Sequence, residues 1–307
     1  MAARKDGCKV VNIAFIGIGA MGTPMALTLA RTGNAVFTYD RNPQRLANVE
    51  IHAETTTCSD LATAVSETQL AITMTPNDDA LLETVHAVVN APRRTVKIFV
   101  DTSSTSLDAT READSVLRAA GITFLDAAVY GLGVQGAKDR CSPIVISGPR
   151  EAYDEIARTI APLGTVDYVG ELGRAKIIKI LNNQLVGAFC VAAAEIVSIG
   201  VAGGIPLPKI IESLTAGSGS SFILEKYYPS YLRSGSFGLG LIPITYMIKD
   251  LRLACELAQE VHSSAALTEL SRQIYQAAEC ELGDVPFPEV YLFYNKLNGI
   301  EREAVTA

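Results

Sequence analysis

The feature that most constrains the fold is a change of sequence pattern near residue 170. Before it, short apolar runs alternate with amphipathic segments of helical periodicity. Strands that alternate with helices are typical of a mostly parallel sheet covered on both faces, so this half predicts a doubly wound α/β fold. The runs that we expect to form strands cover residues 10–16, 35–40, 70–74, 96–101, 122–126, 143–147 and 166–169.

After about residue 170 the strand signals stop. Long helix-compatible segments follow, interrupted by Gly203-Gly204, Pro206 and Pro208. We therefore expect two domains, an α/β domain over residues 1–169 and an all-α domain over residues 170–307.

Composition argues against nucleic-acid or membrane partners. The net charge of −7 does not provide the cationic surface that binds phosphate backbones or anionic lipids. We also expect no apolar stretch to approach the roughly 18 residues that a transmembrane helix needs. Six cysteines without a C-x-x-C pair and three histidines show no metal-ligand spacing. We expect a cytoplasmic protein with reduced thiols and no metal.

Residues 17–22, GIGAMG, match the pattern G-x-G-x-x-G between an apolar run and a helical one. Gly17 permits a tight turn, Gly19 lets the backbone approach a pyrophosphate, and Gly22 allows close packing of helix and strand. The positive end of the helix dipole favours the phosphate. The motif predicts a Rossmann-type dinucleotide site, whose loop also contains Ile18, Ala20 and Met21.

Asp40 stands at the end of the next expected strand. A carboxylate there accepts hydrogen bonds from the adenosine ribose hydroxyls, which favours NAD and repels a 2′-phosphate. Arg41 could instead pair with that phosphate. We expect NAD, with NADP as the alternative.

Several segments occur in the same order as in a known family. They are FIGIGAMGTPMALTLARTG (15–33), TMTPND (73–78), VDTSSTS (100–106), DAAVYGLGVQGA (126–137), GELGRAKIIKILNNQL (170–185) and IKDLRLA (248–254). Together they resemble the β-hydroxyacid dehydrogenases, the family of 3-hydroxyisobutyrate dehydrogenase and tartronate semialdehyde reductase, related to 6-phosphogluconate dehydrogenase.

The resemblance implies an oxidoreductase that moves a hydride between the nicotinamide of NAD(P) and a small 3-hydroxyacid or its semialdehyde. It implies Lys179 as the general acid and base and Asn183 as a substrate-orienting amide. It also implies a homodimer or homotetramer. The substrate carboxylate would be bound by the loop that contains Tyr130, Gly131 and Leu132, and the nicotinamide side of the cofactor by Thr75, Pro76, Ser104 and Lys249.

Tyr130 stands where the family has serine. This change reshapes the expected pocket wall, so the substrate cannot be carried over from the family. Two other functions stay open, an imine reductase on the same scaffold and a non-catalytic NAD(P)-binding protein. Lys179 argues against the imine reductase, and the retained Lys179, Asn183 and Lys249 argue against the non-catalytic protein.

A helical wheel of residues 175–185 gives independent support for this helix as a site. Lys176, Lys179, Asn182 and Asn183 fall within about 120 degrees of one another, and apolar side chains cover the rest. We expect a largely buried helix. We expect Lys179 and Asn183 to face a site, and Lys176 to extend to water.

Overall fold

The computed structural model describes residues 10–50, 54–131, 133–237 and 242–300. Contacts within the chain divide it into two compact units, Met1–Lys179 and Ile180–Ala307. The division falls inside helix α8 (Arg174–Ala202). It lies further along the chain than the domain boundary expected at residues 169 and 170, which stays a prediction.

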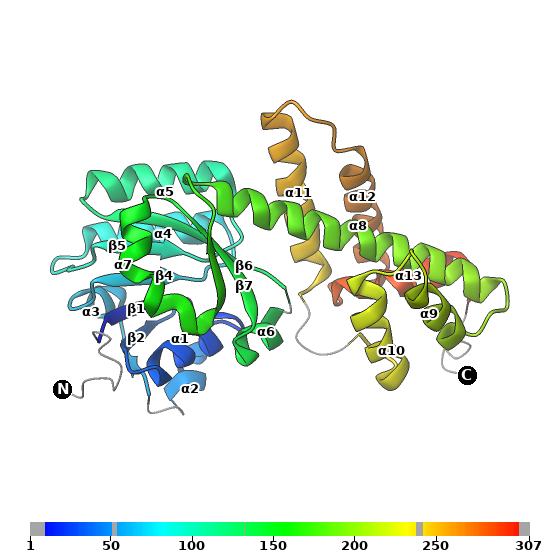
Figure 1. The fold of residues 1–307 in the computed structure, drawn as a ribbon, viewed down its shortest axis with the longest axis horizontal. Coiled ribbons are helices and arrows are strands. Elements are labelled where there is room, and N and C mark those ends of the chain that lie inside the picture. Colours follow the sequence, from blue (N-terminus) through cyan, green and yellow to red (C-terminus); the bar gives the residue numbers. More distant parts are fainter. Residues whose placement is uncertain (1–9, 51–53, 132, 238–241, 301–307) are drawn as a thin grey trace. The chain divides into compact units, whose positions relative to one another are not determined.

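The first unit is built on one sheet with the strand order β3-β2-β1-β4-β5-β6-β7-β8 (Figure 1). All neighbours pair in parallel except β6 and β7, which are antiparallel. Every expected strand is present, and the doubly wound fold is confirmed. The short β3 was missed, since two residues carry no period. The strands are β1 (Asn12–Ile16), β2 (Ala35–Tyr39), β3 (Thr56–Thr57), β4 (Leu70–Thr73), β5 (Ile98–Asp101), β6 (Thr123–Val129), β7 (Ser142–Ser147) and β8 (Gly164–Tyr168).

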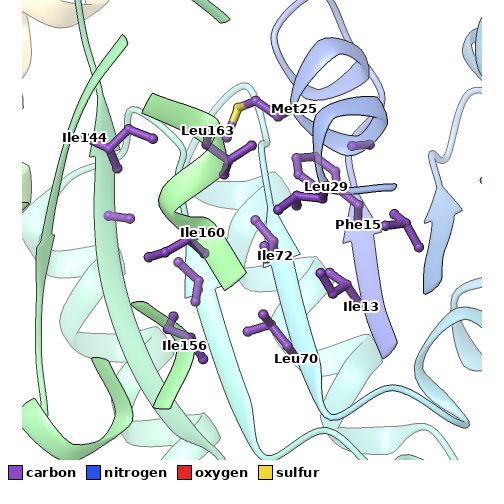
Figure 2. Close-up of a cluster of buried hydrophobic side chains, with 14 of the residues drawn as sticks. Ile13, Phe15, Met25, Leu29, Leu70, Ile72, Ile144, Ile156, Ile160 and Leu163 are labelled. Carbon is purple, nitrogen blue, oxygen red and sulfur yellow. The ribbon is translucent and has the colours of Figure 1, made fainter. Parts of the chain in front are cut away.

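Helices cover both faces of this sheet, which is why its central strands are apolar at successive positions. In β1, Ile13 and Phe15 face one core, and Ala14 and Ile16 face the other. Figure 2 shows the first core, where side chains of β1 and β4 meet helices α1 (Gly22–Arg31) and α7 (Arg150–Ile160). The second core packs under α3 (Leu61–Val65), α4 (Asp78–Asn90) and α5 (Leu107–Ala119). The unit also contains α2 (Pro43–Glu50), α6 (Gly133–Asp139) and a 3-10 turn at Ala161–Leu163.

The described residues of the second unit form helices joined by short connections and contain no strand, as predicted. Its core is rich in tyrosine, with the rings of Tyr231 and Phe237 stacked at 4.7 Å and Tyr228 and Tyr291 edge-to-face at 5.5 Å. After α8 come α9 (Leu207–Ala216), a π-helical turn (Ile223–Tyr227), α10 (Tyr228–Ser234), α11 (Ile244–Glu260), α12 (Ala266–Leu282), a 3-10 turn (Phe287–Glu289) and α13 (Val290–Leu297).

Helix α8 differs from the expectation in two ways. First, it is not buried all round, because one apolar stripe along it is solvent-exposed, formed by Leu181, Leu185, Phe189, Ile196 and Ile199. Second, it is the one described helix long and apolar enough to cross a membrane, with a mean hydropathy of 2.2 over an 18-residue window that is 44% buried. The expectation that no segment reaches that length is wrong. Core helices of soluble proteins meet the same criterion, so this is weak evidence for a membrane span.

Candidate functional site

The candidate site lies at the carboxyl edge of the sheet in the first unit. β1 pairs with β2 on one side and with β4 on the other, because the chain runs outward from β1 through β2 and β3 and then crosses back to β4. Doubly wound sheets bind their ligands at such a switch point, outside the carboxyl ends of the strands. The loops that follow β1, β4 and β5 are therefore the ones that a ligand should meet.

The glycine loop between β1 and α1 has the shape that its sequence predicts. Gly17 has a φ of 98°, a conformation that favours glycine, and a Cβ there would collide with the carbonyl oxygen of Met74. A Cβ at Gly22 would collide with the carbonyl oxygen of Gly17. The packing of the protein itself thus requires glycine at both positions.

Gly19 is different, because no neighbouring atom of the described residues requires it to be glycine. Within the part of the chain that the structure describes, a Cβ there would meet only Arg45 Nη1, at 4.0 Å, which is ordinary contact distance. Helix α1 begins nearby at Gly22, and its first amides have no partner within the helix. Bare backbone beside a helix N-terminus fits the close approach of a pyrophosphate. The loop therefore fits NAD or NADP.

Asp40 is buried and fastens the glycine loop to the residues after β2. Its Oδ2 accepts a hydrogen bond from the amide of Ile18 at 2.8 Å, and its Oδ1 accepts one from the amide of Asn42 at 2.8 Å. Arg45 Nη1 lies 3.6 Å from the carboxylate. The structure thus brings the predicted acidic residue to the predicted loop.

The remaining residues predicted for this part of the cofactor site are less enclosed. Ala20 is exposed, and Met21 occupies the N-cap position of α1. Arg41 is exposed and lies 3.4 Å from Glu83. An exposed pair of this kind is worth little energy, so the Arg41 side chain is free to change partners.

Ser103 fastens the loops that follow β4 and β5 to each other. The amide of Thr75 donates to Ser103 Oγ at 2.7 Å, and the two hydroxyl oxygens are 2.9 Å apart. The predicted residues Thr75 and Ser104 are partly exposed beside this link, and Pro76 is exposed. Sequence reasoning missed Ser103, which is 1% exposed; the doubled serine of VDTSSTS was the available signal.

The expectation that Lys176 extends to water is wrong. Its side chain is 1% exposed, and Nζ donates to Asp101 Oδ2 at 2.8 Å and to the carbonyl oxygen of Ser103 at 2.6 Å. Nζ also lies 3.1 Å from Asp126 Oδ1, an ion pair without hydrogen-bond alignment. A helical wheel gives directions around a helix but not what lies opposite, and here β5 and β6 place two carboxylates there.

These contacts distinguish the two lysines of α8. Burial by itself would lower the pKa of Lys176, but the attraction of Asp101 and Asp126 outweighs it and raises the pKa. Lys176 therefore stays charged and is unsuited to exchanging a proton with a substrate. Lys179, three residues further along the same helix, is partly exposed.

In the second unit, Asn183 is oriented by Asp250. Its Nδ2 donates to Asp250 Oδ2 at 2.6 Å, and its Oδ1 accepts from Asn182 Nδ2 at 3.0 Å. Lys249 Nζ lies 3.4 Å from Asp250 Oδ1 and 5.6 Å from the ring centre of Tyr246. Asp250 was not among the predicted site residues, although the lysine-aspartate motif contains it.

Tyr130 packs against the first turns of α8. Its side chain belongs to a cluster with Ala175 and Ile178 of that helix, and its amide donates to the Pro143 carbonyl at 3.1 Å. Gly131, the next residue, has a φ of 100°. Leu132, the third residue predicted for this loop, lies outside the described residues.

Family models match almost the whole chain. Residues 12–172 match the NAD binding domain of 6-phosphogluconate dehydrogenase, and residues 173–286 match the NAD-binding domain of NADP-dependent 3-hydroxyisobutyrate dehydrogenase. The chain belongs to the β-hydroxyacid dehydrogenase family. Membership in this family confirms the resemblance seen in the motifs and a cofactor that is NAD or NADP.

Individual relatives in the family agree over nearly their full lengths. The chain is 28% identical to 2-(hydroxymethyl)glutarate dehydrogenase of Eubacterium barkeri, covering 95% of this chain and 97% of the relative. It is 28% identical to 3-hydroxyisobutyrate dehydrogenase of Pseudomonas aeruginosa, covering 93% and 99%. A solved structure of Mycobacterium tuberculosis 3-hydroxyisobutyrate dehydrogenase with L-serine has the same fold, with a TM-score of 0.84 at 24% identity over 93% and 99% of the two chains.

The glycine loop yields a matched pair of variants. We expect Gly19→Ala to keep the melting temperature but to weaken cofactor binding at least about tenfold, because its methyl group would occupy the space of the pyrophosphate. We expect Gly17→Ala to weaken cofactor binding and also to lower the melting temperature, because the protein itself blocks a Cβ there. Nucleotide fluorescence titration and thermal melting measure the two effects. Unchanged affinity in Gly19→Ala would contradict this account of the loop.

The hydrogen bond between Asn183 and Asp250 can be tested by a double-mutant cycle. We expect Asn183→Ala and Asp250→Ala each to lower kcat/KM, and the double variant to be little worse than either, because both act through one hydrogen bond. Steady-state kinetics on the four proteins measures this coupling. Fully additive losses would mean that the two residues act separately.

Proposed function

We propose that the protein is an NAD(P)-dependent dehydrogenase that oxidises a small 3-hydroxyacid, or reduces its semialdehyde, with Lys179 as general acid and base. The contrast between the two lysines of α8 is the main support. Lys176 is sealed and paired, and its bond to Ser103 fixes the start of α8 beside the loops proposed for the nicotinamide. Lys179 follows within one helical turn and stays partly exposed.

The chemistry assigns one task to each residue. Bound NAD(P) would supply the hydride acceptor. Lys179, neutral when oxidation begins, takes the proton of the substrate hydroxyl, and in the reverse direction it returns that proton to the carbonyl oxygen. Asn183 lies four residues further on, on the same face of α8. Its amide, oriented by Asp250 and Asn182, holds a substrate oxygen and fixes the angle of attack.

The substrate class is supported by the compounds that the relatives are named for. 2-(Hydroxymethyl)glutarate, 3-hydroxyisobutyrate and L-serine each carry a primary alcohol on the carbon next to the one that bears the carboxylate. Amides of the loop at Tyr130, Gly131 and Leu132 would bind that carboxylate. The bulk of Tyr130 against α8 would set which substituent is accepted.

NAD is the preferred cofactor in this proposal, and NADP is the alternative. Asp40 is 5% exposed, and a carboxylate at this position repels a 2′-phosphate. Arg41 is the residue that could offset this repulsion. Comparing turnover with the two cofactors decides between them.

Turnover assays with hydroxyacids and with imines distinguish two other functions from this one. An imine reductase would reduce imines with NADPH and give no hydroxyacid-dependent rise in NAD(P)H absorbance. A non-catalytic NAD(P)-binding protein would bind the cofactor and turn over neither class. The sequence feature that favours the dehydrogenase is Lys179.

We also propose that a second copy of the chain covers the apolar stripe of α8, giving a homodimer or a homotetramer. Ile196 and Ile199 on this stripe are 53% and 59% exposed, and contiguous exposed apolar surface of this kind marks interaction sites. The five cysteines among the described residues are free thiols, which fits the proposed cytoplasmic location.

The proposed role of Lys179 predicts the behaviour of Lys179→Ala. We expect kcat to fall by about 10²–10⁴-fold, the usual contribution of a positioned acid or base, while cofactor affinity stays nearly unchanged. A panel of 3-hydroxyacids and semialdehydes with each cofactor measures turnover. Lys209→Ala, on an exposed ion pair of α9, is the control. Unaltered turnover in Lys179→Ala would refute the mechanism.

The proposed oligomer predicts the effect of a charge on the stripe. We expect Ile196→Glu to shift the protein to the mass of one chain, 32.7 kDa, because a carboxylate would have to be buried in the interface. Sedimentation velocity measures this mass, and Lys209→Glu serves as the control. Equal masses for wild type and Ile196→Glu would count against the stripe as the interface.

A further inference from the structure

Helix α8 begins at a cap supplied by two strands. The amide of Ala175 donates to Ser147 Oγ at 3.1 Å, and the amide of Lys176 donates to Asp126 Oδ2 at 3.0 Å. Ser147 Oγ in turn donates to Asp126 Oδ2 at 3.1 Å. The first amides of a helix have no partner within it, and a carboxylate there also interacts favourably with the helix dipole. Asp126 and Ser147 therefore fix the start of α8 on β6 and β7.

The side chain of Lys176 joins this cap to the loop after β5. Besides Asp126, its ammonium group contacts Asp101 Oδ2 and the Ser103 carbonyl oxygen. Asp101 Oδ1 accepts from Thr73 Oγ1 at 3.0 Å and from the Ser103 amide at 3.1 Å. Ser103 Oγ then accepts from the Thr75 amide. One chain of polar contacts thus runs from α8 to the loop proposed to line the nicotinamide.

The Asp101–Lys176–Asp126 cluster holds two carboxyl groups and one ammonium group, all buried. Among the described residues, the other side chains that hydrogen-bond to this cluster carry neutral hydroxyls, those of Thr73, Thr105 and Ser147. Burial raises the pKa of Asp126, although Lys176 opposes the rise. Without the ammonium group, two carboxyl groups would share one site, and both could be ionised only at a large cost.

We propose that Lys176 is a positioning residue for the reaction, which acts by neutralising Asp101 and Asp126. It keeps the loop of Ser103 and Thr75 in place for the cofactor, and it fixes the rotation of α8 so that Lys179 points at the substrate. The second effect rests on the proposed function of Lys179. The first needs only the cofactor binding of the family.

The test removes the charge of Lys176 and then restores the net charge of the cluster with a second substitution. Lys176→Gln keeps a hydrogen-bond donor but leaves two facing carboxyl groups. Lys176→Gln/Asp126→Asn returns the cluster to the wild-type charge, with one carboxylate uncompensated. Lys209→Gln, at an exposed ion pair, is the matched control. Cofactor Kd by fluorescence of the reduced nucleotide, kcat with 3-hydroxyisobutyrate and L-serine, and melting temperature are measured between about pH 6 and pH 9, the range in which shifted carboxyl groups titrate.

We expect Lys176→Gln to bind cofactor at least about tenfold more weakly at the upper end of this range and to lose kcat by at least as much. Relative to wild type, both values recover as the pH falls, because one of the facing carboxyl groups takes up a proton. The double variant regains most of the lost cofactor affinity and kcat, and both quantities follow the wild-type pH profile. A residue that only adds stability would give no such recovery.

Two results would overturn the proposal. One is a Lys176→Gln protein with the cofactor Kd and kcat of Lys209→Gln. The other is a double variant whose cofactor affinity and kcat are no higher than those of Lys176→Gln at any pH. If wild type turns over none of the hydroxyacids, the proposed reaction fails, and the cofactor affinities alone decide the role of Lys176.

Asp126→Ala tests the same inference if Lys176→Gln does not fold. It removes the cap of α8 but keeps the bonds of Lys176 to Asp101 and Ser103. We expect kcat to fall at least about tenfold with cofactor affinity within about twofold. Equal losses in both quantities, or in neither, would contradict the inference.

Discussion

The ion cluster of Lys176 with Asp101 and Asp126 is the interaction on which the candidate site depends. It connects β5 and β6 to the first turn of α8, and its hydroxyl partners extend the connection to β4 and β7. Breaking a buried ion pair by removing one partner typically costs about 3–5 kcal/mol. The loops at the carboxyl edge and the start of α8 are therefore held as one network rather than as separate segments.

The glycine loop meets this network at a second point. Met74, whose carbonyl oxygen forbids a side chain at Gly17, immediately precedes Thr75, whose amide is held by Ser103. The shape of the loop after β4 thus depends on both the glycine loop and the loop after β5. Gly17 and Gly22 serve this packing, whereas Gly19 leaves room for a ligand. A single sequence motif therefore combines two structural requirements with one functional requirement.

Much of the fold could be predicted because its signals are local. Apolar runs and helical periodicity identified the strands, and the glycine pattern with Asp40 identified the loop that Asp40 now contacts through Ile18. The errors concern side-chain partners. Lys176 is peripheral on a helical wheel, and Ser103 and Asp250 lie inside the family motifs without a predicted role. Each of these residues acts through a group distant in the sequence or on another element.

The sequence by itself determined the strand and helix pattern, the tight turn at Gly17 and the family of the chain. These follow from backbone conformation and from the period of apolar residues, which neighbouring residues set. Only the tertiary structure decided which lysine of α8 is buried and which is partly exposed. Asp101 is 75 residues from Lys176 in sequence, and the fold of the sheet is what brings its carboxylate to the ammonium group.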